Sequence, residues 1–218
     1  MKRLLIFISF ILVHTAVCCA QDSVPMRDVF SQMPDSLLPY LSHNNKLDLI
    51  DFVESGMESQ VTNSFDEKTR LLKLTPDYLL LQASDMSTVQ LKLLRASAAH
   101  PDSTTAVVCM VSTYGTASPV STVCFYTSKW RSLDMASPLS GVEDRLVARP
   151  DTMDTGRYEM LRRSAYPLMV SAELSATEDI LIVKANAGMM PTDDEKKAVE
   201  PLFRQITLKW NGENFKEN

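Results

Sequence analysis

The chain has 218 residues, of which 22 are Lys or Arg and 27 are Asp or Glu, so its formal net charge at pH 7 is −5. With no basic cluster, it lacks the electrostatic footprint of a nucleic-acid-binding protein. The acidic balance also disfavours anionic lipid headgroups as partners.

The N-terminus has the pattern of a secretory signal peptide. Lys2 and Arg3 precede the apolar run 4–13, and small residues then lead to Ala20. This run is too short and wrongly flanked for a spanning helix. We therefore expect cleavage after Ala20 and export to the periplasm or the extracellular space.

A lipoprotein is the rival interpretation, with a lipid on Cys18 or Cys19. A lipidation signal requires a small residue before the cysteine, and Val17 before Cys18 fits it poorly. No later stretch reaches the roughly 18 apolar residues of a spanning helix, so no transmembrane segment is expected in the mature chain. Loss of Lys2 and Arg3 with the leader lowers the net charge of the mature chain to −7.

Helices are predicted at the start of the mature chain. Met26, Val29, Phe30 and Met33 recur at helical spacing, and Pro34 ends that segment. A second helix is predicted from a cap at Asn44 or Asn45 to Gly56. Short helices are also predicted at 155–164, capped by Asp154 or Thr155, and after Thr192, where Glu195 completes a capping box.

Hairpins are predicted in the middle of the chain. The segments are 78–83 with 88–94, 106–113 with 120–126, and 168–174 with 180–185, and a last strand is predicted at 206–210 before an Asn-Gly turn. The resulting fold class is α+β, with an antiparallel sheet of consecutive hairpins and helices packed on one face. Residues 21–218 are expected to form one domain, or two half-domains of about 21–130 and 131–218.

The central hairpin contains the two cysteines of the mature chain, Cys109 and Cys124. If its turn centres between Thr116 and Ala117, these two residues lie directly opposite on neighbouring strands, with their side chains on one face. Opposed Cα atoms about 4.5–5.5 Å apart are within disulfide reach, and an oxidising compartment would permit the bond. A disulfide between Cys109 and Cys124 and a pair of buried thiols both remain open.

Few residues suggest catalysis, and no cofactor or metal is expected. His43 and His100 lack partners at zinc-ligand spacing, and the sequence contains no nucleophile elbow or Gly-rich phosphate loop. Asp48 and Asp51 lie on one helix face and could form a general acid/base pair, although acids there are usually solvated.

Two further patterns are explained better without a binding role. Asp151, Asp154 and Gly156 miss the ligand spacing of a calcium loop. Tyr114, Tyr126 and Trp130 could line a sugar-binding strip, but core packing explains them better.

Three stretches carry a resemblance to a known family: residues 33–57 (MPDSLLPYLSHNNKLDLIDFVESGM), residues 74–84 (LTPDYLLLQAS) and residues 121–130 (STVCFYTSKW). Together they resemble a family of secreted proteins of Gram-negative anaerobes known as a domain of unknown function. The resemblance implies an exported α+β domain and assigns no activity and no site residues.

Two classes of function remain after these exclusions. The first is a non-catalytic binding domain that holds another envelope protein or a peptide through a sheet face or edge. The second is an envelope hydrolase that uses carboxylates such as Asp48 and Asp51. The absence of nucleophile, metal and phosphate motifs from the sequence favours the binding domain.

Overall fold

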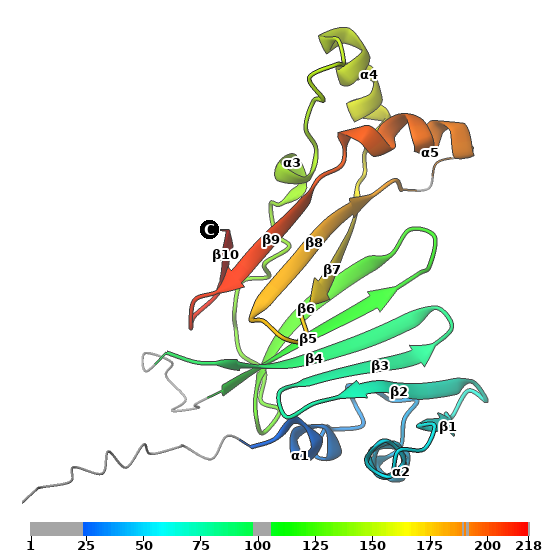
Figure 1. Cartoon of the computed structure of the whole chain (residues 1–218), viewed down its shortest axis with the longest axis vertical. Coiled ribbons are helices and arrows are strands. Elements are labelled where there is room, and N and C mark those ends of the chain that lie inside the picture. Colours follow the sequence, from blue (N-terminus) through cyan, green and yellow to red (C-terminus); the bar gives the residue numbers. More distant parts are fainter. Residues whose placement is uncertain (1–23, 98–105, 189, 191, 218) are drawn as a thin grey trace, which may run out of the picture.

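The computed structural model describes residues 24–97, 106–188, 190 and 192–217, so the predicted signal peptide and His100 lie outside the described residues. Two antiparallel sheets organise this part of the chain (Figure 1). The large sheet has six strands in sequence order: β1 (Gln60–Thr62), β2 (Lys68–Leu74), β3 (Tyr78–Ser84), β4 (Ser87–Arg95), β5 (Ala106–Tyr114) and β6 (Val120–Thr127). The predicted α+β fold built from consecutive hairpins is confirmed.

The small sheet contains four strands in the order β10-β9-β8-β7. Its strands are β7 (Met169–Leu174), β8 (Ile180–Asn186), β9 (Gln205–Trp210) and β10 (Phe215–Glu217). The helical elements are α1 (Met26–Ser31), α2 (His43–Glu54), α3 (Glu143–Leu146), α4 (Thr155–Ala165), α5 (Asp193–Val199) and the 3-10 turn η1 (Glu200–Leu202). Among the described residues, no helix has the length and apolar character needed to cross a membrane.

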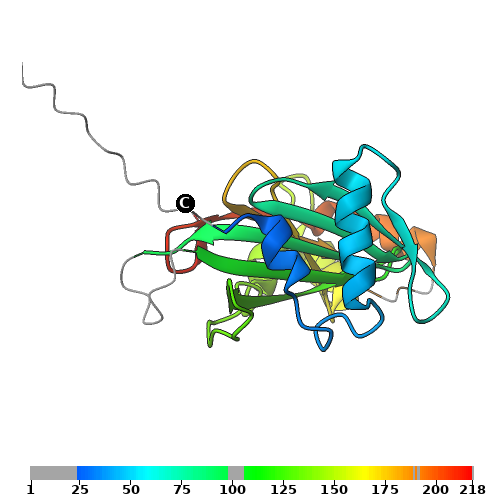
Figure 2. The same cartoon turned by 90° about the horizontal axis from the view of Figure 1, so that it is seen from below.

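The large sheet is the middle layer of the molecule. Helices α1 and α2 cover one of its faces (Figure 2), and the small sheet packs on the other (Figure 1). Two apolar clusters fill these interfaces, and a third joins α4, α5 and η1 at the far end of the molecule. Because both faces are covered, β5 is buried at six consecutive residues, 107–112, instead of at alternate ones.

Polar side chains join the two sheets across their shared core. Strand β7 is an edge strand of the small sheet, but the N–H of Leu174 donates to Gln90 Oε1 at 2.6 Å and the N–H of Ala172 donates to Ser121 Oγ at 2.9 Å. The wholly buried Lys92 adds a 3.4 Å hydrogen bond to the Ala176 carbonyl. The first two contacts satisfy edge N–H groups of β7 that would otherwise lack partners, and the third binds the turn that follows β7.

The central hairpin forms as predicted, but its predicted register is wrong by one residue. Cys109 lies opposite Phe125, and Cys124 lies opposite Met110. The cause is the length of the turn. Tyr114 pairs with Val120, so five residues form the loop and its centre falls on residue 117.

Two of the predicted caps and turns differ from those in the structure. Helix α2 is capped by Ser42, two or three residues earlier than expected, and Asn45 is the N3 residue that completes its capping box. The Asn-Gly pair at 211–212 does not form a two-residue turn, because Trp210 pairs with Phe215 across a loop of four residues. The predicted capping box of Thr192 and Glu195 at α5 is confirmed.

Candidate functional site

The two cysteines lie on opposite faces of the large sheet and are both free thiols. Cys109 is buried between the sheets, where desolvation and then the nearby Cys124 raise the pKa of its thiol. Cys124 is exposed on the face that carries the helices. The predicted direct pairing of the two residues is therefore wrong, and the disulfide loses its geometric basis.

The acids and histidine considered for catalysis do not converge. Asp48, Asp51 and His43 are exposed on α2, and Asp154 caps α4 by accepting from the Arg157 N–H at 2.9 Å. Within the part of the chain that the structure describes, no group of three or more His, Cys, Asp or Glu side chains could hold a metal ion.

The three aromatic residues considered for a sugar-binding strip are not brought together, and Trp130 packs in the core, as the favoured explanation expected. The ring of Trp130 lies 5.5 Å from that of Tyr126, and Trp130 Nε1 donates to the Val29 carbonyl at 2.8 Å in the core under α1. Tyr114 lies at the other end of the large sheet and is exposed.

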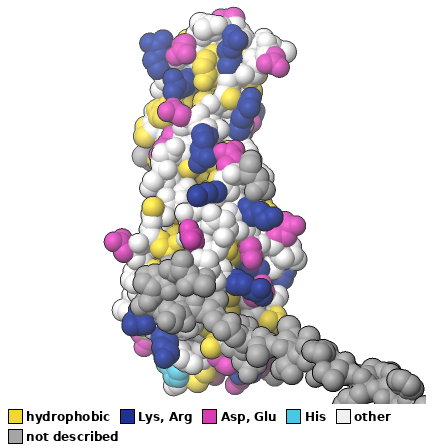
Figure 3. All heavy atoms as spheres, turned by 90° about the vertical axis from the view of Figure 1, so that its left-hand side faces the viewer, with side chains coloured by type: hydrophobic (Ala, Val, Ile, Leu, Met, Phe, Trp, Pro, Cys, Tyr) yellow, Lys and Arg dark blue, Asp and Glu magenta, His cyan; other side chains and the backbone are white. Residues whose placement is uncertain are grey.

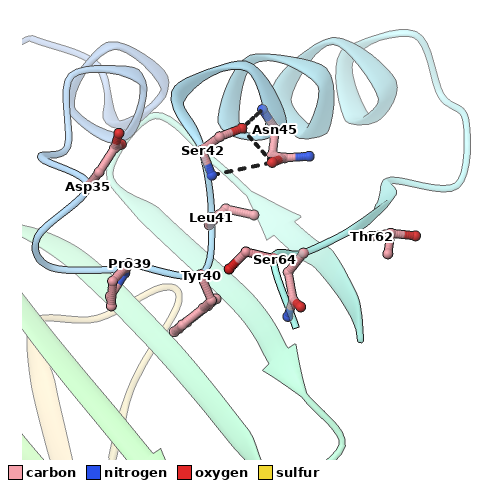
Figure 4. A pocket seen from close by; sticks show the side chains of 9 residues that line it. Asp35, Pro39, Tyr40, Leu41, Ser42, Asn45, Thr62 and Ser64 are labelled. Atoms are coloured by element: carbon pink, nitrogen blue, oxygen red, sulfur yellow. Dashed lines mark hydrogen bonds between the residues drawn. The ribbon is translucent and has the colours of Figure 1, made fainter. Parts of the chain in front are cut away.

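A pocket of about 330 Å³ lies where the segment before α2 passes the end of β1 (Figure 4). It is lined by Asp35, Pro39, Tyr40, Leu41, Ser42, Asn45, Thr62, Asn63 and Ser64. Its volume is at the small end of the range for ligand pockets. We call it the β1 pocket.

One wall of the β1 pocket is an open strand edge. Leu71 N donates to the Ser59 carbonyl at 3.1 Å, and Asn63 N donates to the Glu67 carbonyl at 2.9 Å, so residues 59 and 63 turn their bonding groups toward the neighbouring strand. Because these directions alternate along an antiparallel strand, Gln60 and Thr62 present their backbone N–H and C=O groups outward. Thr62 therefore offers a backbone donor and acceptor to the pocket.

Several polar side-chain atoms of the pocket have no hydrogen-bond partner among the described residues. They are Asp35 Oδ2, Asn45 Nδ2, Thr62 Oγ1 and Ser64 Oγ. The Ser64 N–H, in contrast, is already bonded to the Tyr40 carbonyl at 3.0 Å and closes one end of the pocket. The pocket thus combines free donors and acceptors with the apolar surfaces of Pro39, Tyr40 and Leu41.

Asp35 carries a negative charge at the rim of the pocket. The Nζ of wholly buried Lys46 donates to Asp35 Oδ1 at 2.7 Å and also to the Met33 carbonyl. The hydrogen bond and the charge of Lys46 lower the pKa of the Asp35 carboxyl. Asp35 therefore stays ionised, and its second oxygen remains available for a ligand.

Exposed aromatic side chains surround the pocket at this end of the large sheet. Phe65 is 70% exposed, and its ring centroid lies 6.4 Å from that of Tyr40. Tyr114 is 59% exposed, and Val120 lies directly opposite it on β6. Burial, and then the nearby Tyr114, raise the pKa of Tyr40 to about 12, so its phenol is a neutral hydrogen-bond donor.

Met86 extends this surface along the hairpin tips, since its carbonyl accepts from the Gly115 N–H, next to Tyr114, at 2.8 Å. It is itself 57% exposed. We call Tyr40, Phe65, Met86, Tyr114 and Val120 the aromatic end. Exposed apolar side chains that gather in this way usually mark an interaction site.

The turn that carries Phe65 is held by the buried amide of Asn63. Asn63 Oδ1 accepts from the N–H groups of Phe65 at 2.9 Å and of Glu67 at 3.1 Å. Asn63 Nδ2 donates to Thr69 Oγ1 at 3.2 Å. Asp66 has a φ of 60°, a left-handed conformation that Asp tolerates better than most residues. These hydrogen bonds therefore hold the backbone from which the exposed Phe65 ring projects.

The charge around the aromatic end is predominantly negative. Asp66, Glu67 and Asp85 lie in the hairpin tips, and none of their carboxylates forms an ion pair within the described residues, while Lys68 is the base beside them. A different face of the molecule shows basic and acidic side chains interspersed (Figure 3). The aromatic end thus combines exposed apolar side chains with an excess of acidic ones.

Fold and site together define a two-sheet α+β domain with a polar pocket and an exposed aromatic surface at one end. The chain belongs to the family described as "Protein of unknown function (DUF3256)", whose match covers residues 18–215. No curated protein matches it.

A solved structure shows the same fold: a domain of an uncharacterized protein from Porphyromonas gingivalis W83. It has 21% sequence identity and a TM-score of 0.69, and the match covers 88% of this chain and 98% of that one. At this identity the likeness concerns the fold alone.

Proposed function

We propose that this chain is an exported, non-catalytic binding domain that holds a protein or peptide partner at its aromatic end. The observation that carries the proposal is the gathering of Phe65, Tyr114 and Met86, each more than half exposed, beside the β1 pocket. Aromatic and Met side chains are enriched in protein interfaces, and buried aromatic anchors supply much of the binding energy.

The hydrogen-bonded turn that carries Phe65 supports the same function. The amide of Asn63 fixes the turn below Phe65 before any partner arrives. A loop whose backbone is already ordered loses less conformational entropy on binding, so more of the contact energy appears as affinity.

Export rests on the leader pattern of residues 1–20, with Lys2 and Arg3 before the apolar run. In that compartment the partner would be another envelope protein or a peptide.

Selection from a displayed library of random peptides against the mature chain tests the proposal. Peptides that are enriched should bind the Phe65→Ala and Tyr114→Ala variants at least about tenfold more weakly. Leu72→Ala and Met160→Ala are matched controls, because these side chains are 53% and 56% exposed elsewhere on the molecule. Failure to enrich any peptide, or equal losses in the control variants, would contradict the proposal.

A further inference from the structure

The edge strands of the two sheets differ in whether other parts of the chain bind their outward backbone groups. On β6, the N–H of Thr127 donates to the Arg131 carbonyl at 2.9 Å, and the Phe125 carbonyl accepts from the Leu133 N–H at 2.9 Å. On β7, side chains of the large sheet bind the edge N–H groups. At Thr62, where β1 forms a wall of the β1 pocket, no described residue binds the outward backbone groups of the strand.

We propose that the partner supplies an extended segment that adds to the edge of β1 and places a basic side chain against Asp35. This inference rests on the proposed function and names the chemistry of its partner. The outward N–H and C=O groups of Gln60 and Thr62 would pair with the backbone of the segment, as in strand addition at other open sheet edges. The bond from Ser64 N to Tyr40 O limits the added strand to a few residues.

The free polar atoms of the pocket favour such an occupant. Thr62 Oγ1, Ser64 Oγ and Asn45 Nδ2 lie beside the open edge and can bind backbone groups of the incoming segment. Aromatic or aliphatic side chains at alternate positions of the segment then lie against Tyr40 and Phe65, since side chains of an extended strand alternate between its two sides.

Charge complementarity predicts that the charged side chains of the incoming segment are basic. Asp35 keeps a carboxylate oxygen for a hydrogen bond, although Lys46 balances its charge, and Asp66, Glu67 and Asp85 outnumber Lys68 at the hairpin tips. Lys or Arg on the segment gains from this field, whereas Asp or Glu is repelled by it. The aromatic rings add cation–π attraction for the same basic groups. The predicted ligand is therefore an extended peptide that alternates basic and apolar residues.

Synthetic peptides test this ligand on the full mature chain. The probe alternates Lys with Tyr, and its control alternates Glu with Tyr. Fluorescence anisotropy should show that the Lys peptide binds at least about tenfold more tightly, with an advantage that falls as salt rises. Asp66→Asn combined with Asp85→Asn should reduce this advantage. Equal binding of the two peptides would overturn the charge assignment.

Backbone pairing has its own signature. Two N-methylated versions of the Lys peptide are compared, one methylated at the odd residues and the other at the even residues. In an added strand only alternate N–H groups face β1, so one version should lose binding and the other should keep it. Thr62→Pro should also abolish binding and leave the circular dichroism spectrum unchanged, because the lost N–H points away from β2 and edge strands tolerate proline. Equal tolerance of both methylated sets, or full binding by Thr62→Pro, would overturn strand addition.

These outcomes separate the inference from the function on which it rests. Peptide binding that is lost with Phe65→Ala and Tyr114→Ala but kept with Thr62→Pro contradicts edge addition and leaves the aromatic end as the binding surface. Binding that none of these variants weakens places the peptide elsewhere and contradicts both. Absence of binding by either peptide overturns the inference, and the library selection then decides the function separately.

Discussion

At the scale of single residues, the burial of a side chain in this fold depends on which face of a strand it occupies. Cys109 and Cys124 have similar apolar neighbours in the sequence, yet one is wholly buried and the other is exposed. The one-residue difference in register turns Cys124 to the helix-bearing face, near the outer edge of the large sheet. Desolvation keeps the Cys109 thiol protonated and unreactive.

This difference predicts the reactivity of the two thiols. In the folded mature chain, a maleimide reagent should modify Cys124 and spare Cys109, because a buried thiol is neither accessible nor ionised. Both residues should react after unfolding in urea without a reductant. Intact mass measures the number of adducts, and peptide mapping assigns them. Cys124→Ser is the control and should remove the adduct of the folded protein. Failure of the unfolded protein to react would reveal a disulfide and contradict the structure.

The same residues show why the sequence could not define the register. Alternation of apolar and polar residues sets the register only where one face of a strand is wet, and β5 is buried on both faces from residue 107 to 112. The turn of residues 115–119 permits more than one centre. The existence of the hairpin could be predicted from its β-rich segments and turn residues, whereas the positions of its two cysteines could not.

At the scale of elements, two turns, one from each sheet, meet at the buried amine of Lys92. Lys92 on β4 donates to Asp77 Oδ2 at 2.7 Å, in the turn between β2 and β3. It also reaches the Ala176 carbonyl and lies 3.9 Å from Asp179 Oδ1, both in the turn between β7 and β8. Desolvation alone would raise the pKa of Asp77, but the hydrogen bonds from Lys92 and Thr75 together with the charge of Lys92 outweigh it. The pKa of Asp77 is lowered.

A lowered pKa makes the contribution of Asp77 to stability dependent on pH. A carboxyl whose pKa is lower in the folded state stabilises fully above its unfolded pKa of about 3.9, and this contribution is lost as the pH falls through the folded value. Asp77→Asn should therefore lower the free energy of unfolding clearly at neutral pH. The difference from the wild type should shrink below about pH 4. Urea unfolding at a series of pH values measures both.

The control for this prediction is Asp48→Asn. Asp48 is exposed on α2 and forms no ion pair with a described residue, so its substitution should change the free energy of unfolding by no more than about 0.5 kcal/mol. A constant difference between Asp77→Asn and the wild type across the whole pH series would show that the ion pair with Lys92 does not stabilise the fold.

The candidate site shows the limits of prediction at this scale. Helix α1 and the hairpins follow from apolar spacing, but β1 has only three residues, too few for any period to be recognised. The β1 pocket depends on that short strand and on the loop before α2. Residues 63–67 carry a turn signal in Asn63 and Asp66, and only the folded chain shows that Phe65 between them is exposed.

At the scale of the whole molecule, the two sheets share one apolar cluster. Phe125 of the large sheet lies 6.1 Å from Trp210 of the small sheet, measured between ring centroids, and Trp210 contacts Phe215 at 5.3 Å. Trp210 Nε1 also donates to the Arg95 carbonyl on β4 at 2.7 Å. Separation of the sheets would expose this cluster together with the polar contacts of β7. We therefore expect the sheets to behave as one domain, not as two half-domains.

The two tryptophans of the chain allow a direct test, because each reports on a different layer. Trp130 lies in the cluster between α1 and the large sheet, and Trp210 lies in the cluster between the sheets. In the Trp130→Phe variant, fluorescence follows the inter-sheet core, and in Trp210→Phe it follows the helix-covered core. In each variant the fluorescence transition in urea should coincide with the transition in far-UV circular dichroism, as two-state unfolding of a single domain requires.

Each substitution also removes a buried indole hydrogen bond, so the midpoints of both variants should fall below that of the wild type. Fluorescence that changes at a different urea concentration from the circular dichroism of the same variant would show that the layers unfold separately and that the shared cluster does not couple them.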